Sequence, residues 1–264
     1  EIVCMKKHLW RVFYGDFKES DARRALRIFN EKSNTTDIKR TDAFDLKFLD
    51  QSKSEEIQYI GKLSVNNSCF YREYVLGNDT PEMRATALVI GQALQQPFFT
   101  EMRTNQQLGY IVWSYTRSRD ETYYLSFVIQ SGAFTADDVN QRADDFIAST
   151  PELLTAMDDE TFQQLKESAI EKLEKKPMSI SERANKLQTF IFEHDADFQR
   201  DQKTIAALET LQQSSTVELL SKTLGTDTRR MVNFLMFAEQ HENTTGAKGT
   251  FNKLKTWKAS RSYK

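Results

Sequence analysis

The order of apolar and polar positions predicts strands and one helix over the first part of the chain. Residues 20–33 place apolar side chains on one face of a helix, and a short strand is expected before it at residues 9–14. Residues 44–48 alternate between polar and apolar side chains, as a half-buried strand does. The apolar runs at residues 57–60 and 68–76 predict two further strands.

A helix is predicted next, because Thr80 suits the N-cap position and Pro81 suits the first helical position. Pro97 is expected to end this helix, since proline lacks the backbone N–H that an interior turn needs. Residues 98–104 are then expected to form a further short helix or turn.

The second half of the chain is predicted to be mainly helical. A strand pair at residues 108–117 and 122–131 precedes a helical block of about 90 residues that starts near residue 135. Pro151 is expected to end or kink the first helix of this block. Residues 230–237 predict a closing strand.

Helix-end signals divide the helical block into several helices. Ser179 with Glu182 and Ser215 with Glu218 both have the spacing of a capping box, in which two side chains bond to the first backbone N–H groups. Gly225 is expected at the C-terminal cap of the last helix.

Strands followed by a helical block and a closing strand are typical of an α+β domain. We predict a mixed, largely antiparallel sheet with a helical layer on one face, because this packing buries the apolar side of each element. The polar residues 34–41 predict a linker. This linker is a candidate domain boundary.

Composition and charge narrow the classes of partner. The 264 residues carry a formal net charge of −2, so the sequence lacks the basic excess that would favour nucleic acid. No apolar run approaches the roughly 20 residues of a membrane span, so we expect no membrane partner. The chain begins at Glu1 without an initiator methionine, and we expect it to be part of a longer protein.

The spacing of reactive residues indicates neither a metal site nor a nucleophile. Zinc peptidases bind the metal through two histidines one helical turn apart, beside a glutamate. His8, His194 and His241 are far apart in the sequence, although three such residues could still meet in space. Neither a Gly-x-Ser-x-Gly elbow nor a phosphate-binding loop is present.

The last 22 residues, 243–264, combine six lysines and arginines with three aromatic residues and contain no acid. Three interpretations stay open: docking on an acidic surface of the same protein, a solvated chain end, or a nucleic-acid-binding segment. The small net charge favours docking. Nucleic-acid binding would predict a salt-sensitive affinity that is lost when residues 243–264 are deleted.

One segment directs polar groups outward. In residues 98–112, Arg103 and Tyr110 lie seven positions apart, and Gly109 precedes Tyr110 at the start of a predicted strand. Both side chains could be ordinary surface residues. Alternatively, the glycine lets the backbone approach a neighbour closely, and the guanidinium and hydroxyl groups converge on a peptide carbonyl.

This segment, Phe-Phe-Thr-Glu-Met-Arg-Thr-Asn-Gln-Gln-Leu-Gly-Tyr-Ile-Val, resembles the Arg-Thr-x-x-Gln-Leu-Gly-Tyr signature of the pitrilysin/insulin-degrading-enzyme (insulinase) family of zinc metallopeptidases. The resemblance extends to residues 14–17, 126–131, 157–162, 175–179 and 257–258. It is nearly full-length and closest to the bacterial pitrilysins. The chain is thereby identified as similar to the C-terminal segment of such an enzyme.

The resemblance implies the fold of the LuxS-like and mitochondrial-processing-peptidase-like metallohydrolase domains. Family members have four homologous domains in two halves that enclose a chamber. Residues 1–38 would then be the end of the third domain, and residues 39–264 the complete, non-catalytic fourth domain. Because the zinc ligands belong to the first domain, the resemblance implies zinc in the full-length enzyme and none bound by this chain. It also implies that this chain alone is inactive.

By position in the motif, the resemblance implies that Tyr110 and Arg103 are supporting catalytic residues. Tyr110 would donate to the developing oxyanion, and Arg103 would bond to the substrate carbonyl just after the cut. Phe99 would line the pocket for the residue after the cut, although Phe98 beside it could take that place.

The expected partners are the N-terminal catalytic half of the same enzyme and small peptide substrates. An alternative function is that of a catalytically silent family module that binds partners or peptides. The compartment would be periplasmic for a bacterial pitrilysin-like protein and cytoplasmic for other relatives.

Overall fold

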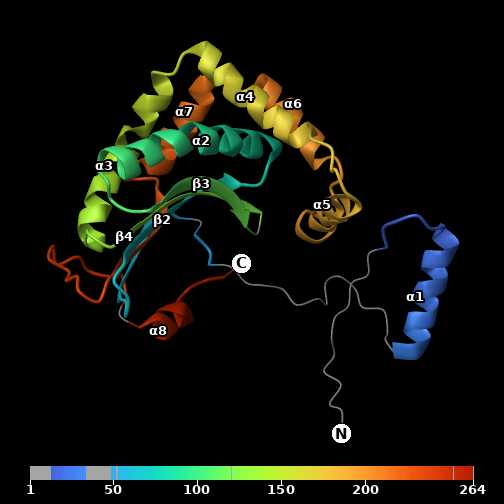
Figure 1. Ribbon diagram of the computed structural model, residues 1–264, viewed down its shortest axis with the longest axis horizontal. Coiled ribbons are helices and arrows are strands. Elements are labelled where there is room, and N and C mark those ends of the chain that lie inside the picture. The colour runs from blue at the N-terminus through green and yellow to red at the C-terminus, as the bar shows by residue number, and fades with distance from the viewer. Residues whose placement is uncertain (1–12, 34–48, 52, 120, 252, 264) are drawn as a thin grey trace, which may run out of the picture. The chain divides into compact units, whose positions relative to one another are not determined.

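The computed structural model describes residues 13–33, 49–51, 53–119, 121–251 and 253–263 (Figure 1). This part of the chain forms two compact units. The smaller unit takes its described residues from the region before residue 49 and from Lys176–Phe198. The larger unit contains the remaining described residues.

Several expectations fall on residues that the structure does not describe. The strand predicted at 44–48 and the boundary predicted near residue 38 lie outside the described residues, as does most of the strand predicted at 9–14. The described end of that last segment, Phe13 and Tyr14, is not in a strand. The division into residues 1–38 and 39–264 therefore stays a prediction.

The centre of the larger unit is a five-stranded sheet with the strand order β1-β5-β2-β4-β3. Its strands are β1 (Glu55–Lys62), β2 (Ser68–Asn78), β3 (Ile111–Arg119), β4 (Thr122–Ser131) and β5 (Arg230–Phe237). β1 pairs with β5 in parallel, and the other neighbouring strands are antiparallel. The predicted mixed, largely antiparallel sheet is confirmed.

Helices cover one face of this sheet (Figure 1). They are α2 (Pro81–Phe99), α3 (Ala136–Thr155), α4 (Asp159–Glu174), α6 (Arg200–Thr210) and α7 (Gln213–Leu224). The helices α2, α3 and α7 contact the strands, while α4 and α6 pack against α2. The predicted helical layer and the α+β class are confirmed. No helix among the described residues is both long and apolar enough to span a bilayer.

The core lies between the sheet and the helices, and alternate strand residues point into it. Phe70 of β2 and Phe127 of β4 are fully buried there. Phe98 of α2 packs edge-on against Phe127 and Phe146 of α3, with ring centroids 5.1 and 5.3 Å apart. Aromatic pairs in this geometry stabilise a core beyond the area that they bury.

The intervening strand residues lie on the other side of the sheet, which we call the open face. Tyr71 and Glu73 of β2 alternate with buried core residues and therefore point to the open face. The register places Ser126 of β4 beside Glu73 and Trp113 of β3 on the same side. This face consequently carries polar, charged and aromatic side chains.

The smaller unit contains α1 (Glu19–Ser33) and α5 (Ile180–Glu193). Helix α1 confirms the helix predicted at residues 20–33. Ser179 is the N-cap of α5, because its side chain accepts a 3.1 Å hydrogen bond from the backbone N–H of Glu182. The helix start predicted from the Ser179–Glu182 spacing is therefore confirmed.

Two prolines lie inside helices. Helix α2 continues through Pro97, so the expectation that Pro97 ends it is wrong, and α3 likewise continues through Pro151. The hydroxyl of Thr150 donates a 2.8 Å hydrogen bond to the carbonyl of Ile147. This bond replaces the one that the missing N–H of Pro151 would have made. At Pro97, the aromatic packing of Phe98 favours continuing the helix.

The capping box predicted at Ser215 is wrong, because the N-cap of α7 is Gln212, three residues earlier. The side-chain amide of Gln213 donates hydrogen bonds of 2.6 and 2.8 Å to the carbonyls of Leu154 and Met157. These bonds fix the start of α7 to the end of α3. Gly225 lies at the C-terminal cap of α7, as predicted.

The basic tail lies along β1 and contains a short helix, α8 (Leu254–Ala259). The N–H of Thr250 donates a 2.7 Å hydrogen bond to the carbonyl of Gln58. Arg261 donates a 2.7 Å hydrogen bond to Glu55, and its guanidinium lies 5.3 Å from the ring of Trp257. The tail therefore docks on the same protein as expected, and Glu55 is an acidic residue that it contacts there.

Asp137 connects the start of α3 to the loop after β5. Its carboxylate accepts hydrogen bonds from the hydroxyl of Thr244 at 3.1 Å and the N–H of Thr245 at 3.0 Å, and also from Thr135. Burial by itself raises the pKa of Asp137, but the hydrogen bonds from these threonines outweigh it and bring the pKa to about 2. The ionised carboxylate therefore stabilises the fold.

We expect Asp137→Asn to lower the free energy of unfolding by about 1–3 kcal/mol near neutral pH, because buried donors lose a charged acceptor. The pKa of Asp137 is lower in the folded state than its ordinary value of 3.8. The stabilisation is therefore complete when the pH is above the ordinary pKa, and it is lost as the pH falls towards the pKa of the folded state.

Urea unfolding of both proteins at about pH 6 and about pH 3 measures this effect, and the difference between them should shrink at the lower pH. Asp145→Asn on the exposed side of α3 is the matched control and should change little. A difference that stays equal at both pH values would contradict this role of Asp137.

Candidate functional site

The segment that carries Arg103 begins where α2 runs without a break into a π-helical turn, η2 (Thr100–Asn105). The N–H of Leu108 donates a 2.9 Å hydrogen bond to the carbonyl of Met102 and closes this wide turn. Residues 98–104 were expected to form a further short helix or turn; residues 100–105 form this π-helical turn, while Phe98 and Phe99 still belong to α2. Turns of this kind are frequent at functional sites.

Buried side chains fix the π-helical turn to the core. Phe98, Met102 and Leu108 are each at most 1% exposed and belong to the core under α2. Phe99 and Arg103 lie on the other side of the turn and are half-buried. The structure thus separates the two neighbouring phenylalanines: Phe98 is a core residue, and Phe99 lies at the surface beside Arg103.

Gly109 allows the chain to pass directly against β4. A Cβ atom at this position would lie 1.9 Å from the carbonyl oxygen of Gln130, so no other residue fits without moving the backbone. Two residues earlier, Gln107 has a φ of 52°, in the left-handed region. These two positions turn the chain from η2 into β3 and fix where Tyr110 lies.

Arg103 and Tyr110 contact each other. Nη1 of Arg103 donates a 2.9 Å hydrogen bond to the backbone carbonyl of Tyr110. The guanidinium carbon lies 4.4 Å from the ring centroid of Tyr110 and 5.0 Å from that of Phe99. Contacts of a cation with two aromatic rings restrict its rotation. The structure therefore brings together the three site residues expected from the sequence.

The phenol of Tyr110 faces solvent. Tyr110 is 80% exposed, and within the described part of the chain its hydroxyl has no hydrogen-bond partner. An aromatic side chain that is exposed beside an edge strand contributes little to the stability of the fold. The hydroxyl is available to donate a hydrogen bond to an external group.

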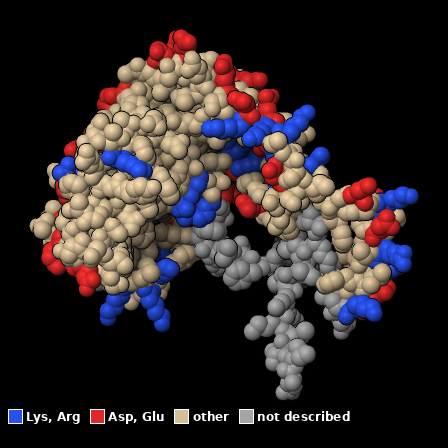
Figure 2. Space-filling model, in the orientation of Figure 1, with Lys and Arg blue, Asp and Glu red and all other residues tan. Residues whose placement is uncertain are grey.

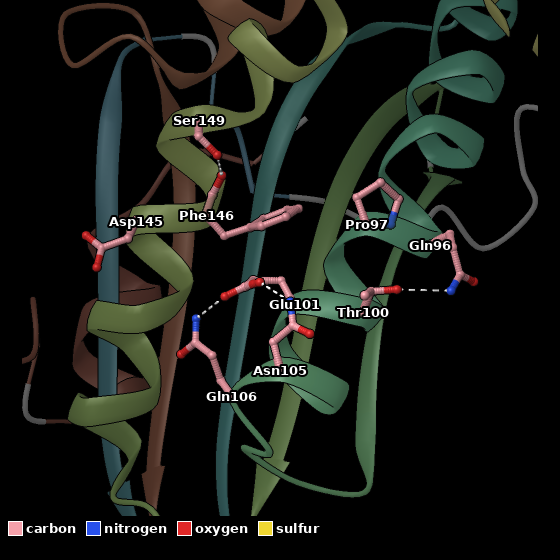
Figure 3. A pocket seen from close by; sticks show the side chains of 9 residues that line it. All are labelled: Gln96, Pro97, Thr100, Glu101, Asn105, Gln106, Asp145, Phe146 and Ser149. Atoms are coloured by element: carbon pink, nitrogen blue, oxygen red, sulfur yellow. Dashed lines mark hydrogen bonds between the residues drawn. The ribbon is translucent and has the colours of Figure 1, made fainter. Parts of the chain in front are cut away.

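The π-helical turn and α3 also line a pocket of about 650 Å³ (Figure 3). Glu101 in this pocket accepts hydrogen bonds from Asn105 at 2.7 Å and Gln106 at 2.8 Å. The bonds from Gln106 and Asn105 lower the pKa of Glu101. Asp145, the second acid, points away from Glu101 (Figure 3). The two carboxylates therefore do not converge on one ligand.

Among the described residues, no group of three or more His, Cys, Asp or Glu side chains is arranged to hold a metal ion. His241 approaches the hydroxyl of Ser68 at 2.9 Å, and His194 lies at the C-terminal end of α5. His8 lies outside the described residues. Within the described part of the chain, His194 and His241 therefore do not fit a zinc site.

Charged side chains of both signs share the surface. On the face shown in Figure 2, lysines and arginines are interspersed with aspartates and glutamates. This distribution agrees with the formal net charge of −2. A surface of this kind favours local ion pairs and solubility over non-specific binding of a polyanion.

The chain is similar in sequence to known peptidases. A family model described as "PQQ synthase PqqF-like, C-terminal lobe domain 4" matches residues 89–188, which include Arg103 and Tyr110. Protease 3 of Salmonella typhi is 27% identical over 136 residues, which are 52% of this chain and 14% of that protein. Insulin-degrading enzyme of Homo sapiens is 30% identical over 140 residues, which are 53% of this chain and 14% of that enzyme.

The fold is that of solved peptidase structures. A crystal structure of pitrilysin matches with a TM-score of 0.80 and 18% identity, over 95% of this chain and 27% of that chain. A structure titled as a peptidase M16 inactive domain from Pseudomonas fluorescens matches with a TM-score of 0.57 and 15% identity, over 83% of this chain and 51% of that one. The chain thus spans a minor part of the length of the curated relatives that it matches.

We expect Gly109→Ala to lower the free energy of unfolding by about 2 kcal/mol, because the new Cβ would overlap the carbonyl of Gln130 and push the backbone off β4. Urea unfolding measures this cost. Gly132→Ala is the matched control, since its Cβ would meet a movable side-chain atom of Asn67 at 3.1 Å. Equal costs for both variants would contradict the close approach at Gly109.

Proposed function

We propose that this chain, a relative of the C-terminal part of the insulinase-family peptidases, supplies Arg103 and Tyr110 to a zinc metalloendopeptidase that cuts small peptides in a closed chamber. The pairing of an exposed hydroxyl with a stacked guanidinium on one fixed turn carries the proposal. The groups that activate the attacking water belong, in this proposal, to another part of the peptidase. Phe99 lines the pocket for the substrate residue after the cut.

Arg103 is proposed to bind the substrate carbonyl just after the cut. A guanidinium group has five N–H donors, and the carbonyl of Tyr110 uses one of them. The contacts with the rings of Tyr110 and Phe99 hold the group in place before substrate arrives. A donor that is already oriented loses less entropy when it binds, so the remaining N–H groups can position the peptide.

Tyr110 is proposed to donate a hydrogen bond to the oxyanion that develops when the scissile carbonyl is attacked. Its hydroxyl is exposed, while its backbone is fixed by Gly109 and by the bond from Arg103. Donors that are fixed in advance stabilise developing charge without reorganising during the reaction. This interaction strengthens in the transition state, so it should affect kcat more than KM.

We expect Tyr110→Phe in the full-length protein to lower kcat/KM for a fluorogenic peptide by about 10²–10³-fold, the loss typical for one oxyanion donor. Arg103→Ala should also lower kcat/KM, and both variants should keep the wild-type circular dichroism spectrum. Tyr115→Phe on β3, the strand that follows Tyr110, is the control for losing a phenol. Wild-type rates in both site variants would refute the proposed roles.

A second function, a catalytically silent module that binds partners or peptides, is supported by the similarity to a structure titled as an inactive domain. The two functions differ in whether the longer protein carries a His-x-x-Glu-His motif. A silent module would lack that motif. Tyr110→Phe would then change the affinity for a peptide, and neither the variant nor the wild type would cleave it.

A further inference from the structure

The open face carries a buried carboxylate that is surrounded by donors. Glu73 of β2 is 5% exposed. Its Oε2 accepts hydrogen bonds from the hydroxyl of Tyr71 at 2.6 Å, from Arg117 at 2.5 and 3.0 Å, and from the hydroxyl of Ser126 at 3.3 Å. Its Oε1 accepts a 3.0 Å hydrogen bond from Arg119. We call these five residues the Glu73 cluster.

The Glu73 cluster has a surplus of positive charge. Burial raises the pKa of Glu73, but the hydrogen bonds from Tyr71 and Arg117 and the charges of both arginines outweigh it, so the pKa lies below its ordinary value. The carboxylate is therefore ionised near neutral pH. Two guanidinium charges against one carboxylate charge leave one positive charge uncompensated.

The surplus charge is directed outward. The side chains of Arg117 and Arg119 are 40% and 42% exposed, while the carboxylate that they share lies beneath them. Arg117 uses Nε and Nη2 for its bonds inside the cluster, and its Nη1 donates to no other described residue. Arg230 on the same face adds another cation, and it donates to the backbone carbonyl of Gln51.

The two arginines of the cluster lie on β3, and Tyr110 directly precedes this strand. β3 is the last strand in the sheet order, so in the described chain it pairs on one side, with β4. Arg117 follows Tyr110 by seven residues, which is about 23 Å along an extended chain. Trp113, which is 57% exposed, lies between them. A peptide in extended conformation beside β3 has the same rise per residue.

We infer that Arg117 and Arg119 bind the carboxylate of an acidic side chain in the peptide substrate and thereby select an acidic residue about seven positions from the scissile bond. This inference rests on the proposed peptidase function. Guanidinium groups match carboxylates in shape and form charge-assisted hydrogen bonds with them. Glu73 holds both guanidinium groups in position, and the exposed ring of Trp113 gives the intervening peptide an apolar contact.

The test uses the full-length protein and pairs of fluorogenic peptides that differ by Glu or Gln at the seventh residue from the cut. One pair carries the change before the cut, and another pair carries it after the cut. For one of the two pairs, we expect the Glu peptide to have a KM about five- to tenfold lower at equal kcat. Arg117→Gln should bring this ratio close to one, and the control Arg142→Gln on α3 should preserve it.

A second variant moves the ratio in the opposite direction. Glu73→Gln removes the buried negative charge and leaves both guanidinium groups uncompensated, while its amide oxygen still accepts a hydrogen bond. We expect it to increase the preference for the Glu peptide by about two- to threefold, with a stronger dependence on ionic strength. A variant that is merely less stable would not gain selectivity.

Equal KM values for the Glu and Gln peptides of both pairs would overturn the inference. It would also be overturned if the ratio of the KM of the Gln peptide to that of the Glu peptide were the same in Arg117→Gln as in the wild type. If the protein cleaves neither peptide, the proposed function fails. The Kd values of the same peptides from fluorescence anisotropy then still test whether Arg117 selects the acid. Inorganic triphosphate that competes more strongly than the Glu peptide at equal concentration would identify phosphate as the ligand and overturn carboxylate selection.

Discussion

The central sheet buries one of its faces under helices, and the placement of every functional group follows from this one-sided burial. The strands must carry apolar residues such as Phe70 and Phe127 at alternate positions, because these face α2, α3 and α7. The intervening positions are free to carry charge, and Glu73, Arg117 and Arg119 use that freedom. The sheet also ends at β3, so the edge beside Tyr110 stays without a strand partner in the described chain.

The Arg103–Tyr110 pair spans the boundary between the two layers. Arg103 comes from the helical layer and Tyr110 from the start of the sheet, and the chain must turn sharply between them. Gly109 makes the turn possible, because its backbone lies against the carbonyl of Gln130 where a side chain would clash. The core that the two layers share thus holds this pair of side chains together.

The sequence predicted the sheet, the helical layer and most helix starts, because each depends on apolar spacing or on a local capping residue. It did not predict that α2 would continue through Pro97, and it left open whether α3 would end or kink at Pro151. The hydroxyl of Thr150, which compensates for Pro151, acts through a three-residue spacing that many threonines share. The motif placed Arg103 beside Tyr110, but the π-helical turn between them depends on the burial of Met102, a tertiary effect.

The Glu73 cluster was not visible in the sequence, because its members come from three strands that are separated by long stretches of chain. Tyr71 and Glu73 lie on β2, Arg117 and Arg119 on β3, and Ser126 on β4. Their positions alternate correctly for one face of a sheet, but sequence alone does not define the register that aligns them. The one signal was the polar or charged character of open-face positions in otherwise apolar strands.

The π-helical turn η2 has a consequence for how related chains can differ in length. A π-helical turn holds one residue more than an α-helical turn, so this part of the chain has the geometry of α2 with a single residue inserted. Deleting one residue within Thr100–Asn105 would restore α-helical spacing and leave the helix on either side in phase, while residues of the turn itself, such as Arg103, would rotate by about 100° about the helix axis. The position of gaps in this segment would therefore separate homologues that can form the Arg103–Tyr110 pair from homologues that cannot.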